Sequence, residues 1–180
     1  MSCVYQLKIT IQGSKPPIWR RLLVTSDTSL EVLHDIIQMC FSWENYHLYA
    51  FQIGEHTIDQ ESNAELSASL ENFSLAENDH FKYIYDFGDD WLHDIHVEKI
   101  EPPKADQHYP CCLAGKRAGP PEDSGGIWGY TELLEALGNR HHPDHQEMRD
   151  WVGRHFDPEQ CDISAINRRL IALSKMATIE

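Results

Sequence analysis

The sequence predicts an α+β fold in which a β-sheet carries one helix early in the chain and several helices late. Three observations support this prediction. Two pairs of segments with alternating apolar and polar residues are each joined by a turn, one amphipathic helical segment follows the first pair, and three helical segments lie near the C-terminus. We expect the second pair to complete a mixed or antiparallel sheet, with the C-terminal helices packed on it.

The first part of the chain reads as strand, strand, helix, strand. VYQLKITIQ alternates, GSKPP makes a turn, and IWRRLLVT returns as a second strand, with Pro16 and Pro17 confined to its start. Thr28 and Glu31 fit a capping box, with Thr28 as the N-cap of a helix that should run to about Ser42. LYAFQIG then predicts a third strand. The order of hairpin, helix and strand is the opening of a β-grasp-like arrangement.

The second hairpin, from Phe81 to Ile100, is the most informative stretch of the chain. Its two strands meet at a turn that carries Asp86, Asp89 and Asp90. Asp and Gly stabilise turns by local hydrogen bonds and tolerate unusual dihedral angles, so these residues have a structural explanation. A polar tip held by a rigid sheet is also a common place for function.

Alternation in the strand that follows this turn places Trp91, His93, Ile95 and Val97 on one face. His93 should therefore point into the core together with the apolar side chains. We expect it to be a core histidine whose ring is satisfied by a carboxylate or a carbonyl, rather than a metal ligand or a base.

Residues 104–130 are rich in Pro and Gly, and we expect a long loop that is either functional or docked, with Trp128 as its anchor. Residues 131–180 should form a cap of three helices. Thr131 is expected to cap the first of them and Pro143 to start the second. The third repeats apolar residues at helical spacing to near the C-terminus.

Length and composition limit the classes of function. A chain of 180 residues suits one domain over residues 1–180, with residues 1–103 mainly sheet plus one helix. The five cysteines form no C-x-x-C pair, and the N-terminus carries no apolar signal core, so we expect a protein of the reducing cytoplasm. No apolar run approaches the roughly 20 residues that span a bilayer, so we expect a soluble protein without a membrane role.

The excess of acidic over basic residues limits the kinds of partner that the chain is expected to bind. The formal net charge is −14. General affinity for duplex DNA depends on Lys and Arg that neutralise phosphates, so the composition argues against it. An acidic surface instead favours basic peptides or basic protein surfaces through complementary charge.

Four motifs cover nearly the whole chain, in the order PPIWRRLLV, YDFGDDWLHDI, YPCCLAGKRAGPPEDSGGIWGYTELLEAL and WVGRHFDPEQCDISAINRRL. In their order and spacing they resemble the Ri-plasmid ORF-3-like family, a group of proteins found on plasmids and in microbial chromosomes. The resemblance implies an α+β domain of unestablished biochemical function. Some relatives have been labelled resolvases or associated with DNA-binding repressor modules, but the resemblance supplies no active site.

The candidate site combines the second hairpin with the carboxylates that follow Pro120 and Pro121. The candidate ligand-binding residues are Asp86, Asp89, Asp90, Trp91, His93, Glu122, Asp123 and Trp128. If the two segments meet, a divalent cation is the expected ligand of the five metal candidates, Asp86, Asp90, His93, Glu122 and Asp123. Hard cations prefer carboxylate oxygens, and a bound metal activates water for hydrolysis. No other cofactor is predicted.

Three functions stay open at this level. The first is a non-catalytic binding or adaptor module, whose acidic groove is walled by Tyr83, Tyr85, Trp91 and Trp128 and receives a basic partner. The second is a metal-dependent hydrolase or nuclease that uses the same carboxylates. The third, suggested only by the resemblance, is a DNA-associated accessory protein of mobile elements that contacts DNA through the adjacent arginines of the first hairpin.

Overall fold

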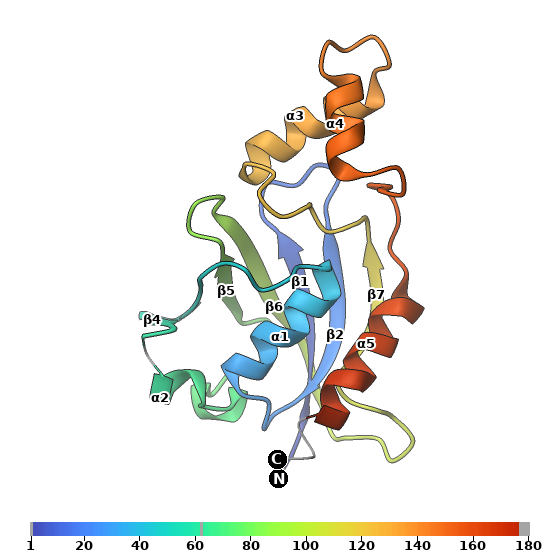
Figure 1. Cartoon of the computed structure of the whole chain (residues 1–180). Coiled ribbons are helices and arrows are strands. Elements are labelled where there is room, and N and C mark those ends of the chain that lie inside the picture. Colours follow the sequence, from blue (N-terminus) through green and yellow to red (C-terminus); the bar gives the residue numbers. More distant parts are fainter. Residues whose placement is uncertain (1, 62, 177–180) are drawn as a thin grey trace.

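The protein, described by a computed structural model over residues 2–61 and 63–176, has the α+β fold that the sequence predicts (Figure 1). One open sheet contains seven strands. They are β1 Val4–Ile11, β2 Trp19–Thr25, β3 Tyr49–Ile53, β4 His56–Asp59, β5 His80–Tyr85, β6 Trp91–Glu101 and β7 Cys111–Lys116. Their order is β4-β3-β5-β6-β1-β2-β7, and every neighbouring pair is antiparallel. Of the two sheet types that the sequence left open, the structure has the antiparallel one.

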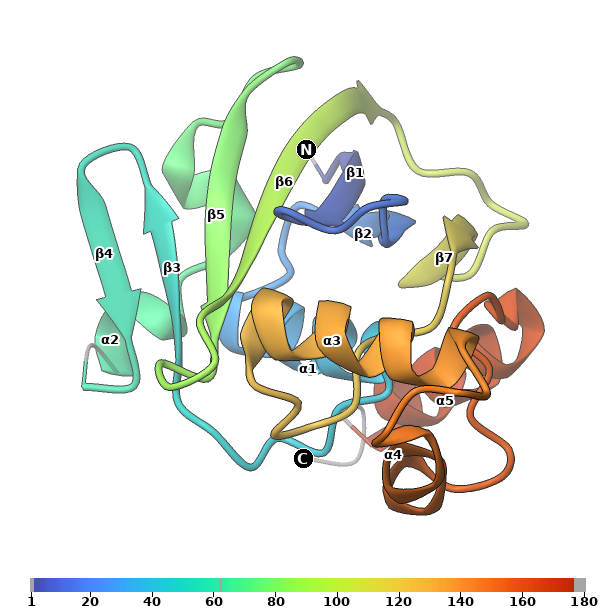
Figure 2. The ribbon, with the colours of Figure 1, turned by 90° about the horizontal axis from the view of Figure 1, so that it is seen from above.

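The larger helices lie on one side of this sheet. They are α1 Leu30–Phe41, α3 Gly126–Gly138, α4 His145–Val152 and α5 Ile163–Met176, with the short α2 Asn63–Leu66 and the 3₁₀ helix η1 Leu70–Phe73 between β4 and β5. Seen from above, α1, α3 and α5 occupy the same side of the curved sheet (Figure 2). No helix in the described part of the chain is both long enough and apolar enough to cross a membrane.

Burial follows the strand alternation predicted for the second hairpin. Trp91, His93, Ile95 and Val97 are each at most 1% exposed, whereas the residues between them are half-buried. The pleat alone explains this pattern, because successive side chains in a strand point to opposite faces. The inward face packs against α1, whose Leu33, Ile36 and Ile37 are fully buried in the same core.

Several expected boundaries are wrong. Helix α1 is capped by Ser29, whose hydroxyl accepts the Val32 N–H at 3.2 Å, and not by Thr28. The segment 104–130 is not entirely a loop, because it contains β7, which pairs with β2, and the first turn of α3. The sequence predicted a single strand after α1, but a second strand, β4, follows β3 and pairs with it.

The expected starts of two C-terminal helices are wrong as well. Helix α3 begins at Gly126, so Thr131 lies inside it, where the hydroxyl donates to the Ile127 carbonyl at 2.7 Å. Helix α4 begins at His145 after the N-cap Asp144, and Pro143 precedes the cap. Trp128 does not anchor a loop, because it lies on α3 and is 83% exposed.

On the face of the sheet away from the helices, Glu98 of β6 links three strands. Its Oε2 accepts from Arg21 Nε of β2 at 2.6 Å and from Gln6 Nε2 of β1 at 2.8 Å, and its Oε1 accepts from Arg21 Nη2 at 2.8 Å. The two parallel bonds from the guanidinium are the strongest geometry for such a pair. Chiefly through these bonds, Arg21 lowers the pKa of Glu98 from 4.5 to about 2.

We predict that Glu98→Gln lowers the free energy of unfolding at pH 7 by about 1 kcal/mol, the scale of a well-formed surface ion pair. The folded-state pKa lies below the unfolded one, so the stabilisation is fully present above pH 4.5 and is lost as the pH falls toward 2. Denaturant unfolding of both proteins between pH 7 and pH 2 measures the difference. Glu101→Gln, an exposed position on the same strand, is the control. A difference that persists undiminished at pH 2 would contradict the ionic origin.

Candidate functional site

Three segments that are distant in sequence meet at one end of the sheet. They are the turn between β5 and β6 (residues 86–90), the loop between α1 and β3 (residues 42–48), and the PPED loop (residues 120–123). Trp43 Nε1 donates to the Pro120 carbonyl at 2.9 Å, and the Asp86 N–H donates to the Leu48 carbonyl at 2.9 Å. The PPED loop and the hairpin also touch directly, because the Tyr85 hydroxyl at the end of β5 donates to Glu122 Oε1 at 2.9 Å, a contact that the sequence could not place.

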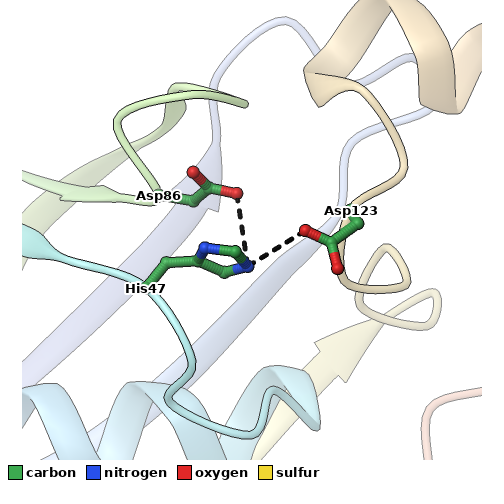
Figure 3. A group of neighbouring side chains, drawn as sticks. All are labelled: His47, Asp86 and Asp123. Carbon is green, nitrogen blue, oxygen red and sulfur yellow. Dashed lines mark ion pairs between the residues drawn. The ribbon is translucent and has the colours of Figure 1, made fainter.

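We call the place where residues 42–48, 86–90 and 120–123 meet the junction, and His47 lies at its centre (Figure 3). Its Nε2 is 3.1 Å from Asp123 Oδ1, 3.6 Å from Asp86 Oδ2 and 3.9 Å from Glu122 Oε2. One ligand atom from each of His47, Asp86 and Asp123 lies within 4.8 Å of the other two. An imidazole nitrogen and carboxylate oxygens in this arrangement form a donor set that could bind a metal ion.

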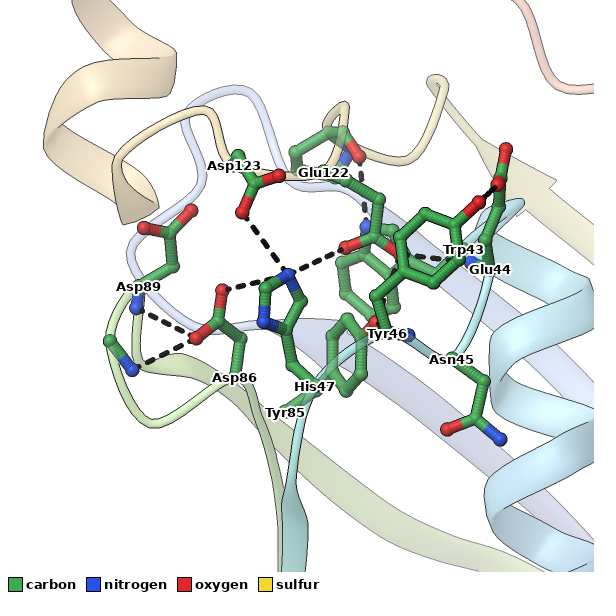
Figure 4. A network of polar contacts seen from close by, with 12 residues as sticks. Trp43, Glu44, Asn45, Tyr46, His47, Tyr85, Asp86, Asp89, Glu122 and Asp123 are labelled. Atoms are coloured by element: carbon green, nitrogen blue, oxygen red, sulfur yellow. Dashed lines mark hydrogen bonds and ion pairs between the residues drawn. The ribbon is translucent and has the colours of Figure 1, made fainter.

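Glu122 is fixed by its other carboxylate oxygen (Figure 4). Oε1 accepts the Glu44 N–H at 2.8 Å and the Tyr85 hydroxyl at 2.9 Å. The Tyr85 hydroxyl in turn accepts the Tyr46 N–H at 3.2 Å. Burial, followed by the hydrogen bond to Glu122, raises the pKa of Tyr85, so this phenol stays protonated and remains a donor at neutral pH.

Asp86 also divides its two oxygens between two tasks. Oδ1 accepts the N–H groups of Gly88 at 2.9 Å and Asp89 at 3.3 Å, which is the turn-forming role expected from the sequence. Oδ2 is the atom that faces His47. The turn explanation and the binding explanation therefore apply to different atoms of one side chain.

Two polar atoms of the junction are buried without a hydrogen bond among the described residues. They are Glu122 Oε2 and His47 Nε2, and the neighbours of His47 Nε2 are the carboxylate oxygens named above. Buried polar atoms are rarely left unpaired, because the lost hydration costs about 1 to 3 kcal/mol for each group. Asp86 is itself only 7% exposed, whereas the side chain of Asp123 is 71% exposed. The junction is thus closed on the hairpin side and open on the side of the PPED loop.

Asp89 and Asp90 lie outside the cluster around His47. Asp89 Oδ2 accepts the Gly125 N–H at 3.0 Å, which ties the hairpin to the start of α3. A Cβ atom on Gly126, whose φ is +64°, would lie 2.2 Å from the Asp89 carbonyl oxygen, so this close approach requires a glycine. Asp90 is exposed and adopts φ 53° at the end of the turn.

Trp91 and His93 are buried in the core and do not line the junction. The Nδ1–H of His93 donates to the Trp91 carbonyl at 2.8 Å and is 3.3 Å from that of Tyr83. Burial lowers the pKa of His93 to about 4, so the ring is neutral at pH 7. Its Nε2 has no hydrogen bond among the described residues, and the centroid of its ring lies 5.2 Å from the ring centroids of Phe41 and Trp43. His93 is thus a core histidine held by carbonyl groups.

The aromatic wall expected for an acidic groove is also in the core. Tyr83 and Tyr85 are fully buried and Trp91 is 1% exposed. The exposed apolar side chains near the junction are different ones, Tyr46 and Leu48 on either side of His47, and Phe87 at the tip of the turn. Trp128 is exposed on α3.

His47 was missing from the sequence-based candidates. It stands in the polar turn ENYH, which matches no metal-binding or catalytic spacing, and its partners are tens of residues away. Only the pairing of β3 with β5 brings the two residues before β3 beside the residue after β5. A prediction of that pairing is the one signal that could have identified it.

Comparison with known proteins agrees with the fold and the motifs. The chain matches the model of the plasmid pRiA4b ORF-3-like protein family over residues 3–165. It is 33% identical over 181 residues to the uncharacterised protein y4hQ of Sinorhizobium fredii, across 93% of this chain and 91% of that protein. It also resembles the crystal structure of the protein of unknown function MM3350 from Methanosarcina mazei Go1, with a TM-score of 0.85 and 40% identity over 91% of this chain and 97% of that one. The chain therefore belongs to the plasmid pRiA4b ORF-3-like family, as its four motifs predicted.

Proposed function

We propose that this protein is a binding module for a divalent cation, held by His47, Asp86 and Asp123 with Glu122 beside them. The observation that carries the proposal is the convergence of one imidazole nitrogen and three carboxylates from three separate segments. Carboxylates gathered at a partly buried point repel one another unless a positive charge lies between them. A cation there would also give a partner to Glu122 Oε2, which has no hydrogen bond, and would bind His47 Nε2, whose neighbours are carboxylate oxygens 3.1 to 3.9 Å away.

The mixed donor set favours some ions over others. Zn²⁺ and Mn²⁺ suit a site with one imidazole and two or three carboxylates, because imidazole binds transition metals and carboxylates suit both ions. Ca²⁺ takes six to eight oxygen ligands, and Mg²⁺ keeps most of its own water. We therefore expect Zn²⁺ or Mn²⁺ to bind more tightly than Ca²⁺ or Mg²⁺.

Two other interpretations of the sequence receive less support. A groove for basic peptides loses its expected aromatic wall, since Tyr83, Tyr85 and Trp91 are in the core. Contact with DNA through the arginines of the first hairpin requires free guanidinium groups. Arg20 is 2% exposed, and Arg21 is paired with Glu98.

The cation site predicts which substitutions weaken binding. Wild-type protein should bind one Zn²⁺ or Mn²⁺ ion per chain in isothermal titration calorimetry. His47→Ala and Asp86→Asn should each reduce the affinity at least tenfold, because each removes a ligand. Asn at position 86 keeps a carbonyl oxygen for the turn, so the fold is preserved.

Asp90→Asn is the matched control for that experiment. It removes the same charge from the same turn at an exposed position outside the cluster, and it should leave the affinity within about twofold. Failure of every tested ion to bind the wild-type protein would overturn the proposal. Equal weakening by Asp86→Asn and Asp90→Asn would show that the overall negative charge attracts the ion and that the cluster around His47 does not bind it.

A second candidate function is metal-dependent hydrolysis, and one observation favours it. The side chain of Asp123 is 71% exposed, so one side of the junction is open to solvent. Zinc sites with three protein ligands keep a further position for water, and the metal lowers the pKa of that water to about 7. The same site would then supply a metal-bound nucleophile.

This second function predicts ester hydrolysis that depends on the added ion. Bis(p-nitrophenyl) phosphate and p-nitrophenyl acetate, followed by release of p-nitrophenolate, test phosphodiester and carboxylic ester chemistry. We expect the rate in His47→Ala to fall at least tenfold and the rate in Asp90→Asn to match the wild type. Tight ion binding without hydrolysis of either ester would rule out the enzyme with these substrate classes and leave the binding module.

A further inference from the structure

A second candidate site lies on the other side of the PPED loop. A pocket of about 310 Å³ opens between the end of α1, residues 118–121 and the start of α5. Its apolar lining includes Phe41, Val152, Phe156 and Ile166, and its basic side chains are Arg20, Arg169 and His155. The volume is at the lower end of the range for small-molecule sites, which are mostly apolar with a few fixed polar groups.

Arg20 is a buried cation without a carboxylate partner among the described residues. It is 2% exposed, and its Nε and Nη1 donate to the carbonyls of Cys40 at 2.9 Å, Trp19 at 2.8 Å and Lys116 at 3.0 Å. The guanidinium also stacks on the Phe41 ring, 4.8 Å from its centroid. These contacts fix the side chain but supply no negative charge. Within the described residues no carboxylate lies within ion-pairing distance of it, and its Nη2 has no hydrogen bond.

Arg169 brings a second cation to the same pocket from α5. Its Nη1 donates to the Ser42 hydroxyl at 3.0 Å, while its Nε is buried without a hydrogen bond among the described residues. Burial, as the largest effect, lowers the pKa of Arg20; the nearby thiols of Cys161, Cys40 and Cys112 act against it, and the charge of Arg169 acts with it. The net lowering is the direction expected of a buried cation whose carboxylate partner is missing.

Each of the two acidic residues of the pocket has one oxygen in a local backbone hydrogen bond. Asp162 Oδ1 accepts the Ala165 N–H at 2.9 Å at the start of α5, and Asp157 Oδ1 accepts the Glu159 N–H at 2.9 Å in a turn. Neither forms an ion pair with Arg20 or Arg169 by distance. A buried guanidinium is usually paired, since a charge removed from water is costly without a partner.

We propose that this pocket binds a small oxyanion, a carboxylate or a phosphate carried on an apolar group, between Arg20 and Arg169. The planar fork of a guanidinium presents parallel N–H donors that match the oxygens of either group. The aromatic and aliphatic walls would cover the apolar part of the ligand. This site is separate from the proposed cation site, and its ligand has the opposite charge.

Calorimetric titration of the full chain in low-salt buffer with EDTA tests the proposal independently of any cation. The probes are phenyl phosphate and benzoate, with benzamide as a neutral molecule of similar shape. We expect at least one of the two anions to bind at a single site and benzamide to bind at least tenfold more weakly. Tighter binding of phenyl phosphate assigns the pocket to phosphate esters, and tighter binding of benzoate assigns it to carboxylates.

Variants on α5 locate the binding. Arg169→Gln should lower the affinity for the anion at least tenfold. Arg169→Lys keeps the charge but loses the planar fork of the guanidinium, so it should give an intermediate affinity. Arg168→Gln removes the same charge from an exposed position on the same helix and should change the affinity less than twofold. The proposal is overturned if neither anion binds the wild-type protein at millimolar concentration, or if Arg168→Gln and Arg169→Gln weaken binding equally.

Discussion

The burial of one face of the seven-stranded sheet is the constraint on which the rest of this structure depends. The inward side chains of the central strands β1 and β6 are almost fully excluded from water, and α1 covers them. Removing such side chains from water is the dominant stabilising term, at about 25 cal/mol for each Å² of apolar surface. At the end of the sheet where β5 turns into β6, the core becomes aromatic. The ring centroid of Trp43 lies 4.8 Å from that of Tyr85 and 6.2 Å from that of Trp91.

That aromatic end supports the junction around His47. The side chain of Trp43 packs in the core while its Nε1–H fixes the PPED loop, and Tyr85 is buried while its hydroxyl fixes Glu122. Rigid side chains of this kind hold polar groups in one geometry without much further loss of conformational entropy. The carboxylates of Asp86 and Glu122 each combine two roles. One oxygen accepts hydrogen bonds that hold the fold, and the other faces the imidazole of His47.

The sequence predicted those features that depend on local pattern. Strict alternation from Trp91 to Val97 was enough to place His93 in the core, because the two-residue period of a strand does not depend on what the strand pairs with. The sequence also identified Asp86, Glu122 and Asp123 as candidate ligand-binding residues, although turn formation alone could explain the position of Asp86.

Features set by long-range pairing could not be predicted in this way. Strand β7, CCLAGK, is an edge strand that lacks the alternation of the other strands and follows a proline, so its pairing with β2 left no local signal. The start of α3 at Gly126 left no signal in the sequence, since glycine is a weak helix former. The glycine is there because the Asp89 carbonyl approaches its Cα too closely for any side chain. His47 and the unpaired charge of Arg20 are likewise products of tertiary contacts.

The distance in sequence between His47, Asp86 and the PPED loop has a thermodynamic consequence. An unfolded chain holds these groups apart, so a ligand that needs all of them binds only the native state and shifts the folding equilibrium by mass action. The stabilisation it gives grows as the logarithm of its free concentration above the dissociation constant. The junction would then act as a clasp between the hairpin, the PPED loop and the segment before β3, and separation of any one of them would release what it holds.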